Sequence, residues 1–461
     1  MQLLIIGGSD AGISAALRAR EIDPDVDVTL VLADQYPNFS ICGLPFFLSG
    51  EVPDWQRLAH RSREEIERHG ITVLTEHVAE AIETRSNEVR VRYGDAERTL
   101  SYDKLIVATG ATPIRPPIAG LDTAGVYVLH TMDDSFVLNE RLRTARSAVI
   151  IGAGYIGVEM ADALTHRGIT VTLVERLPSV LTTVDPEFGA LIESELTSHG
   201  VRVETNTQVD GIVPTAGGVR VGGPGGFSIE ADIALVVVGV RPNGALAAAA
   251  GAMLGYAEAI RVTPGMATSL PDIYAAGDCV ETRHRLLKRN VYLPLGTTAH
   301  KQGRVAGENA VGGAATFRGV VGTQVVKILS RVVAGTGLTA ARAKDAGFDV
   351  RVVESISPDH KAYYPGSSEM RVRVIGDAAT GQLLGGQILG TWGSEIAKRI
   401  DVFATALYHG MRVDELVDLD LSYTPPLSSP WDPIQMAALA WTAGDRTLTG
   451  TLLHRVTGST A

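Results

Sequence analysis

The sequence predicts an α/β protein in which two Rossmann-like units precede a separate α+β domain. Three observations support this fold class. A strand, a glycine-rich turn, a helix and a second strand occur in that order at the N-terminus, and the same series returns after residue 147. From about residue 320 onward, strands and helices continue without any further glycine-rich turn. The length of 461 residues suits about three domains at ~150 residues each.

The first unit begins with the apolar stretch 2–6, which we expect to form a buried strand. A helix over about 13–21 and a second strand over 26–32 follow the turn. Asp34, just after this second strand, is a candidate acid for binding a ribose hydroxyl. The turn itself departs from the full dinucleotide fingerprint, because a serine occupies the place of the middle glycine. Its residues are Gly7, Gly8, Ser9, Asp10, Ala11 and Gly12.

The second unit has the complete fingerprint between a strand over 148–151 and a helix over 158–168. Glycines let the backbone approach a pyrophosphate, whose charge the helix N-terminus stabilises. Glu175 ends the next strand, 170–174, where an acid takes a ribose hydroxyl. Glu175 favours NADH by repelling a 2′-phosphate, whereas the neighbouring Arg176 leaves NADPH open. The predicted turn residues are Gly152, Gly154, Tyr155, Ile156 and Gly157.

Two further apolar strands and the C-terminal region complete the pattern. One strand, within 102–110, ends at Ala108, Thr109 and Gly110, and the other, within 272–278, ends at Gly277 and Asp278. The glycine-dense stretch 217–226 is interpreted as a hairpin turn. The C-terminal region is predicted to contain strands over 325–329, 350–353, 370–375 and 383–390, and helices over 338–346 and 394–409.

Composition excludes several classes of protein. The net charge of −11 argues against a dedicated nucleic-acid binder. Neither a signal peptide nor an apolar run of ~20 residues is apparent, so we expect a cytoplasmic protein with no membrane contact. The two cysteines, Cys42 and Cys279, are too few for a disulfide framework or a four-cysteine metal site. The eleven histidines are scattered, and no metal site is expected.

Together, the two turns and the two strand ends resemble the flavoprotein disulfide reductases that have two dinucleotide-binding domains and a glutathione-reductase-like fold. The resemblance implies that the first unit binds FAD, that the second binds NADH or NADPH, and that Asp278 holds the flavin ribityl chain. Further cofactor contacts are expected from Val78, Arg115, Gly239, Thr298 and Ala299. The implied domains are FAD-binding (1–112 and 243–319), NAD(P)H-binding (113–242) and dimerisation (320–445), with a tail (446–461).

Dithiol members of this family have two cysteines beside the flavin, whereas this chain has only Cys42 there. The surrounding segment 38–46 resembles the single-cysteine branch, which includes coenzyme A disulfide reductases, persulfide reductases, NADH oxidases and NADH peroxidases. Segments 362–366 and 422–429 resemble the coenzyme A disulfide reductase subset. There the last domain forms a homodimer, and its tyrosines reach the partner's cysteine. The resemblance therefore implies catalytic roles for Cys42, Tyr363, Tyr364 and Tyr423 in a shared site.

The residues around Cys42 support a redox role. Gly43, Leu44 and Pro45 can open a helix, and a thiolate at a helix N-terminus has a lowered pKa. In the expected cycle, reducing equivalents pass from NAD(P)H through FAD to a mixed disulfide on Cys42. A Tyr364 or Tyr423 hydroxyl then hydrogen-bonds to the outgoing thiolate. Cys279, which follows Asp278, is interpreted as a packing residue.

Three positions depart from the family pattern. Asp10 stands where NADH oxidases and peroxidases have a histidine, Leu32 where a ribose-binding glutamate is usual, and Glu21 where a coenzyme A-binding member has arginine. The predicted function is FAD-dependent, NAD(P)H-driven reduction of a small, coenzyme A-like disulfide or persulfide. The alternatives are an NADH oxidase or peroxidase that cycles Cys42 through sulfenic acid, an electron-transfer reductase for a protein partner, and a non-catalytic redox sensor.

Overall fold

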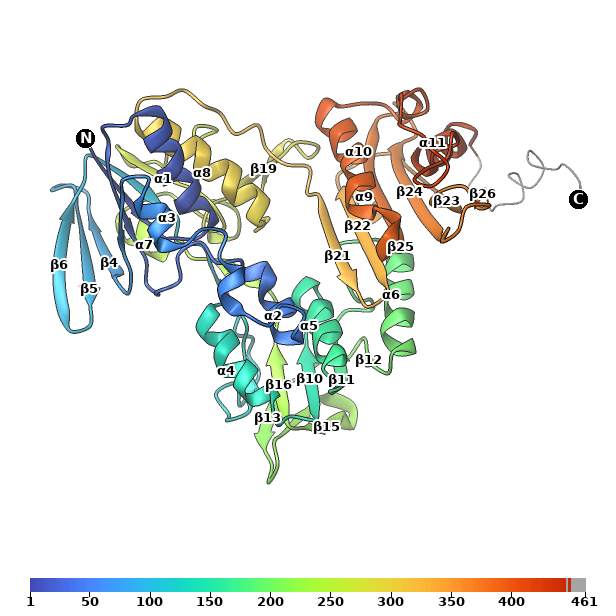
Figure 1. Cartoon of the computed structure of the whole chain (residues 1–461), viewed down its shortest axis with the longest axis horizontal. Helices are drawn as coiled ribbons and strands as arrows, with labels where there is room; N and C mark the ends of the chain where they lie inside the picture. Colours follow the sequence, from blue (N-terminus) through green and yellow to red (C-terminus); the bar gives the residue numbers. More distant parts are fainter. Residues whose placement is uncertain (445–446, 449–461) are drawn as a thin grey trace, which may run out of the picture.

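A computed structural model of the chain describes residues 1–444 and 447–448 (Figure 1). An N-terminal lobe, drawn in blue and yellow, lies beside a C-terminal lobe in orange and red. A third lobe, drawn in teal and green, lies below both (Figure 1). The predicted tail, 446–461, lies outside the described residues apart from Thr447 and Leu448. Within the described part of the chain, no helix is long and apolar enough to cross a bilayer.

The N-terminal lobe is built on a parallel five-stranded sheet in the order β18-β7-β1-β2-β3. Strand β1 is buried almost throughout, which explains its continuous apolar sequence. Although β18 follows the middle lobe in sequence, it pairs with β7 and so completes the first sheet. The strands are β1 (Gln2–Ile6), β2 (Asp27–Val31), β3 (Ile71–Leu74), β7 (Lys104–Val107) and β18 (Ile273–Ala275).

Helices α1 (Asp10–Ile22) and α8 (Gly296–Ala310) pack closely against each other beside this sheet. Their close approach depends on two glycines of α8. A Cβ atom on Gly303 would overlap the backbone of Ala11, and one on Gly307 would overlap the backbone of Ala15. The buried face of α1 consists largely of alanine and glycine, which allows the same short separation.

The middle lobe repeats this architecture in the order β12-β11-β10-β16-β9, again with parallel strands. Two connections join it to the first lobe, and they pair with each other as the antiparallel strands β8 (Ala111–Pro113) and β17 (Val240–Pro242). Its sheet contains β9 (Val126–Tyr127), β10 (Ser147–Ile151), β11 (Thr170–Val174), β12 (Arg202–Glu204) and β16 (Ile233–Val236). Its helices are α4 (Met132–Leu142), α5 (Tyr155–His166) and α6 (Pro186–Ser198).

Each of these lobes also has a three-stranded antiparallel sheet, β4-β5-β6 in the first and β13-β14-β15 in the second. The second of these corrects one prediction. The stretch 217–226 is not a single hairpin turn, because β14 (Val219–Gly222) lies inside it and pairs with both neighbours. The remaining strands are β4 (Val78–Glu83), β5 (Glu88–Tyr93), β6 (Ala96–Ser101), β13 (Gly211–Pro214) and β15 (Ser228–Ala231).

The C-terminal lobe is a six-stranded sheet in the order β21-β22-β25-β24-β23-β26. Its first five strands pair antiparallel. Helices α10 and α11 pack on it. The elements are β21 (Gln324–Ile328), β22 (Arg331–Gly337), α9 (Ala340–Asp345), β23 (Val350–Pro358), β24 (Glu369–Asp377), β25 (Leu383–Thr391), α10 (Ile396–His409), α11 (Pro433–Thr442) and β26 (Thr447–Leu448).

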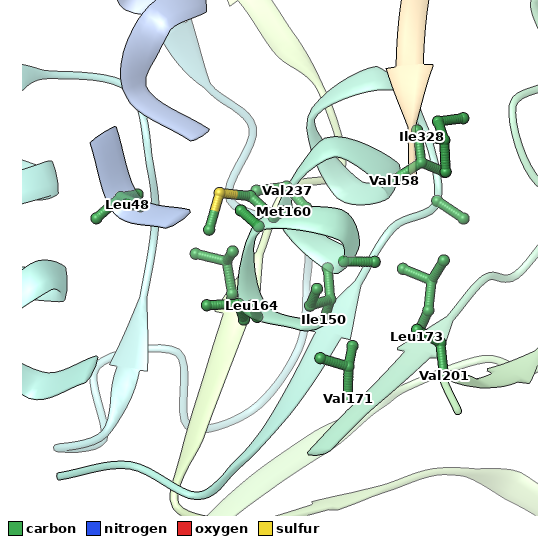
Figure 2. Packing of buried hydrophobic residues seen from close by; sticks show 14 of the residues in the cluster. Leu48, Ile150, Val158, Met160, Leu164, Val171, Leu173, Val201, Val237 and Ile328 are labelled. Atoms are coloured by element: carbon green, nitrogen blue, oxygen red, sulfur yellow. The ribbon is translucent and has the colours of Figure 1, made fainter. Parts of the chain in front are cut away.

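One hydrophobic core joins parts of all three lobes (Figure 2). Leu48, on the short helix α2 (Leu44–Ser49) of the first lobe, points toward Met160 and Leu164 of α5. On another side of α5, Ile328 of β21 reaches the same core from the C-terminal lobe. The chain around α2, which includes Cys42, is therefore held against the middle lobe.

Candidate functional site

A single large cavity of about 3250 Å³ extends from the glycine turn before α1 to the glycine turn before α5. One drug-sized ligand occupies a pocket of roughly 300–1,000 Å³, so this space accommodates more than one ligand. Cys42 lies on its wall. The predicted cofactor residues on the wall are Gly7, Gly8, Ser9, Asp10, Ala11, Asp34, Val78, Ala108, Thr109, Gly110, Arg115, Gly152, Gly154, Tyr155, Ile156, Glu175, Arg176, Gly239, Gly277, Asp278 and Ala299.

The first glycine turn leaves space and free N–H groups at the start of α1. Gly7 has φ +113°, and a Cβ atom there would overlap the carbonyl of Ala108. Ser9 caps α1, but its side chain makes no capping hydrogen bond, so the N–H groups of the first turn face the cavity unblocked. This arrangement fits a pyrophosphate. Gly12 does not line the cavity, because it packs against the carbonyl of Gly7.

The second glycine turn has the same construction. Gly152 has φ +105°, Gly154 caps α5 without a side chain, and Gly157 packs against the carbonyl of Gly152 rather than lining the cavity. Glu175 at the end of β11 reaches into this turn, where its Oε2 accepts a hydrogen bond from Ala153 N at 2.7 Å. The turn and its acid thus form one polar wall that fits a dinucleotide.

Cys42 lies in a short 3₁₀ turn, Ile41–Gly43, immediately before α2, and its side chain is open to the cavity. The loss of water contact inside the cavity raises the pKa of its thiol, and the carboxylates of Glu159, Asp10 and Asp278 raise it further. The predicted lowering of this pKa is therefore wrong. The helix after Cys42 has only six residues, so its dipole is weak, and three carboxylates oppose it.

Two of these carboxylates are themselves shifted. Burial raises the pKa of Glu159 to about 7, with a further contribution from Asp162. Burial and the nearby Asp10 raise the pKa of Asp278 to about 6. The wall near Cys42 therefore contains groups that exchange protons close to neutral pH. Sequence reasoning missed Glu159, although its i,i+4 spacing from Tyr155 would have placed it on the same face of the predicted helix.

The predicted catalytic tyrosines lie elsewhere in the chain. Tyr363 and Tyr364 are exposed in the loop 359–368 between β23 and β24, and Tyr423 is exposed in the segment before α11. Partial loss of water contact, together with the nearby Tyr363, raises the pKa of Tyr423. None of the three lines the cavity with Cys42, so one chain does not bring them to the thiol.

The first lobe supplies two further polar groups to the cavity wall, and of these Tyr292 was not predicted from the sequence. The hydroxyl of Tyr292 is buried without a hydrogen-bond partner, and this residue lines the cavity near Asp278. His300 lies on α8 in the same wall, 2.6 Å from the Ser14 hydroxyl of α1. Thr298, a predicted cofactor contact, is buried in α8 and does not line the cavity.

Two family profiles match almost the whole chain. The profile described as pyridine nucleotide-disulphide oxidoreductase matches residues 1–303. The profile of the dimerisation domain of the same family matches residues 323–433. The first range covers the N-terminal and middle lobes, which contain the two glycine turns. The second range covers most of the C-terminal lobe, which contains the tyrosines.

Individual relatives extend over nearly the full length. The chain is 34% identical to "NAD(P)H sulfur oxidoreductase (CoA-dependent)" of Pyrococcus abyssi, over 95% of this chain and 97% of the relative. It is 32% identical to "NADH oxidase" of Methanocaldococcus jannaschii, over 95% and 98%. The solved NAD-dependent persulfide reductase from A. fulgidus superposes with a TM-score of 0.93 at 38% identity, covering 96% of this chain and 83% of that one.

Proposed function

The chain belongs to the pyridine nucleotide-disulphide oxidoreductase family, and we propose that it reduces a small disulfide or persulfide through Cys42. It is an NAD(P)H oxidoreductase, with FAD and NAD(P)H as its cofactors.

The observation that supports a thiol mechanism is the contrast between the two cysteines. Cys42 is exposed on the cavity that contains both glycine turns. Cys279 is fully buried, and its Sγ–H donates to the carbonyls of Ala276 and Val107 at 3.3 and 3.5 Å. Cys42 therefore has no internal thiol with which to form a disulfide, and its second sulfur has to come from a substrate.

Two of the relatives support a sulfur acceptor. The names "NAD(P)H sulfur oxidoreductase (CoA-dependent)" and "NAD-Dependent Persulfide Reductase" belong to two proteins that align with nearly the whole chain. Both describe the reduction of sulfur species with a nicotinamide cofactor. We assign this chemistry to the present chain because its one exposed thiol lies on the cavity where the cofactors fit.

Each cofactor has a set of residues that would hold it. The turn from Gly7 to Ala11 and the carboxylate of Asp278 would hold FAD, which when bound accepts a hydride from NAD(P)H and supplies two electrons for the reduction. The turn from Gly152 to Ile156 would hold the pyrophosphate of NAD(P)H, and Glu175 its ribose. We assign NADH as the preferred donor because Glu175 repels a 2′-phosphate.

The proposed reaction at Cys42 has two steps, and each step releases one thiolate from the acceptor. The Cys42 thiolate attacks one sulfur of the acceptor RSSR, forms a mixed disulfide and releases the first RS⁻. Two electrons that originate from NAD(P)H then cleave the mixed disulfide, regenerate the Cys42 thiolate and release the second RS⁻. We assign Tyr364 and Tyr423 of the partner subunit as hydroxyl donors to the departing thiolates, because within one chain they face solvent on the dimerisation domain.

The test is anaerobic stopped-flow absorbance of the flavin in the FAD-loaded dimer. The enzyme is first reduced with NADH and then mixed separately with coenzyme A disulfide, a coenzyme A persulfide, oxygen or peroxide. Rapid flavin reoxidation by the disulfide or persulfide is expected. Cys42→Ser should abolish this phase, whereas Cys279→Ser, in which the hydroxyl can replace the buried S–H donor, should retain it.

Two outcomes would contradict the proposal. If only oxygen or peroxide reoxidises the flavin, the enzyme is an oxidase or peroxidase that cycles Cys42 through sulfenic acid. If Cys42→Ser keeps full activity with an electron-carrier protein, the thiol takes no part. The mass of the adduct on Cys42 in the purified protein provides an independent check, since coenzyme A, one sulfur and one oxygen differ in mass.

A further inference from the structure

A single buried arginine connects the two segments that bear the exposed tyrosines. Arg399 of α10 is 9% exposed, and its guanidinium donates to groups from both segments. Its Nη2 donates to the carbonyl of Asp359 at 2.7 Å and to that of Leu427 at 3.1 Å. Its Nη1 donates to the carboxylate of Asp432 at 3.1 Å. One planar group thus fixes the spacing of two loops that are far apart in sequence.

The first segment is the loop 359–368, which holds Tyr363 and Tyr364. Asp359, which is 4% exposed, closes it at both ends. Its Oδ1 accepts from Ser368 N at 3.0 Å, and its Oδ2 accepts from the Ser394 hydroxyl at 2.8 Å. The tyrosines therefore project from a loop whose base is held by hydrogen bonds to a buried carboxylate, so their positions depend on that base.

The second segment runs from Tyr423 to Asp432, where α11 begins. Asp432 caps this helix by accepting a hydrogen bond from Ile434 N at 2.8 Å, while its other oxygen pairs with Arg399. Because both partners of this ion pair are buried, removing one would leave an uncompensated charge in the core. The pair therefore couples the start of α11 to α10.

The two segments also touch each other at the surface. Lys361 N donates to the carbonyl of Pro425 at 3.3 Å, and Lys361 Nζ lies 4.6 Å from the centre of the Trp431 ring. These contacts are exposed, so the buried guanidinium beneath them is the more rigid of the two connections.

Helix α10 links this arrangement to the cavity. Ala397, Lys398 and Asp401, which flank Arg399 on α10, line the cavity that contains Cys42, whereas Arg399 faces the opposite way into the C-terminal lobe. A displacement of the tyrosine segments relative to α10 would therefore change their position relative to a cavity wall.

We infer that Arg399 is a positioning residue. It holds Tyr364 and Tyr423, the tyrosine pair, in the geometry required to meet the cysteine and substrate of the partner subunit. This inference rests on the proposed function, in which Tyr364 and Tyr423 act as hydroxyl donors. Arg399 itself touches neither the substrate nor a cofactor. Lysine retains the charge but lacks the planar fork, which here donates to four acceptors: the Asp432 carboxylate and the carbonyls of Ser394, Asp359 and Leu427.

The test compares Arg399→Lys with the pair Tyr364→Phe/Tyr423→Phe, and with all three changes together, in the FAD-loaded dimer. Flavin reduction by NADH should stay within about twofold of wild type in every variant, because it does not involve the tyrosines. The kcat for coenzyme A disulfide should fall at least about tenfold in Arg399→Lys. In the combined variant, Arg399→Lys should cause no further loss beyond that of the tyrosine pair.

Arg371→Lys serves as the matched control, because Arg371 of β24 pairs with Glu354 and Glu369, and none of the hydrogen bonds or ion pairs in the described part of the chain joins it to either tyrosine segment. It should keep the wild-type kcat. If Arg399→Lys does not yield a folded dimer, Asp432→Asn replaces it, because it removes the charge while keeping the size of the side chain; the same loss of kcat is expected.

Unchanged kcat in the Arg399 or Asp432 variant would overturn the inference. So would a combined variant whose kcat falls by the product of the two separate reductions, because the arginine and the tyrosines would then act independently. Failure of the proposed function is recognised separately. In that case coenzyme A disulfide does not reoxidise the flavin of the wild-type enzyme. If it does so but Tyr364→Phe/Tyr423→Phe keeps the wild-type kcat, the tyrosines are not the hydroxyl donors, whatever happens at Arg399.

Discussion

The carboxylate of Glu175 accepts a hydrogen bond from the backbone N–H of Ala153, across 2.7 Å, inside the glycine turn that opens α5. Its other oxygen accepts from Leu177 N at 2.9 Å. These two bonds hold the acid at the end of β11 against the turn, so a negative charge stands beside the place where the ribose of a nicotinamide dinucleotide fits. Arg176 lines the same cavity.

Replacing this charge should change the cofactor preference. Glu175→Gln is expected to lower kcat/KM for NADH and to raise it for NADPH, because the amide no longer repels a 2′-phosphate. A shift of about tenfold in the ratio corresponds to about 1.4 kcal/mol. Steady-state kinetics with both nucleotides measure it. Arg176→Ala, the matched control, should weaken only NADPH, and an unchanged ratio in Glu175→Gln would disprove this role.

The carboxylate of Glu159 should govern the reactivity of Cys42. Because a nearby negative charge raises the pKa of the Cys42 thiol, Glu159→Gln is expected to lower that pKa. The pKa of Glu159 is about 7, so its charge, and hence the difference from wild type, should be present above pH 7 and fade below it.

The pH dependence of iodoacetamide alkylation of Cys42 in the reduced, FAD-loaded enzyme measures this effect. Glu140→Gln, which removes an exposed carboxylate from α4, is the control and should leave the alkylation profile unchanged. Identical profiles for Glu159→Gln and wild type would mean that the carboxylate does not act on the thiol.

The buried His284 should make the protein less stable in acid. It is 1% exposed, and its Nε2 has no hydrogen-bond partner among the described residues. Burial, with Arg342 and Arg289, lowers its pKa from 6.5 to about 4. A depressed histidine pKa contributes stability above the unfolded value, near pH 6.5, and this stability is lost as pH falls toward 4. The full loss is about 3 kcal/mol.

Thermal unfolding at a series of pH values tests this linkage. The midpoint of the wild-type protein should fall between about pH 6.5 and pH 4 more steeply than that of His284→Gln. His199→Gln, a change at a histidine on the surface of the middle lobe, should follow the wild-type curve. Parallel curves for wild type and His284→Gln would contradict the assignment.

The close packing of α1 on α8 should be sensitive to one methyl group. Gly307→Ala places a Cβ atom against the backbone of Ala15, which a rigid helix pair cannot easily move. We expect a loss of about 1–3 kcal/mol in stability and weaker retention of FAD, because α1 also carries the first glycine turn. Differential scanning fluorimetry and the flavin content after gel filtration measure both effects.

Gly217→Ala is the matched control for Gly307→Ala. Nothing lies within 4 Å of an added Cβ at that position, so stability and flavin content should not change. An equally stable Gly307→Ala variant would show that the helices can separate without cost.

Local patterns predicted the two Rossmann-like units closely. Strands β1 and β10 were predicted within a residue of their observed bounds, because strands covered on both faces consist of continuous apolar residues. Helices α1 and α5 begin three residues earlier than predicted. In both, the first turn lies inside the glycine fingerprint, where helical periodicity is not yet visible.

The pKa of Cys42 could not be predicted in the same way. Gly43, Leu44 and Pro45 indicated a helix, and α2 is indeed present, yet the direction of the shift is opposite to the expected one. Burial in the cavity is the largest cause, and the carboxylates that add to it come from three remote parts of the chain: Asp10 at the start of α1, Glu159 on α5 and Asp278 after β18. No local pattern reports the distance between such groups.

By itself, the sequence determined the two glycine turns and the order of the strands that flank them. It also determined that Cys42 precedes a helix start and that Cys279 follows the strand end at Asp278. These depend on near neighbours in the chain, since a turn, a buried strand and a helix start are set by a few consecutive residues. Only the tertiary structure decided that Cys42 opens onto the cavity that contains both glycine turns, which acids surround it, and that Arg399 joins Asp359 to Asp432. Electrostatic shifts and buried hydrogen bonds depend on separations of a few ångströms between distant segments, and these separations arise only when the lobes pack.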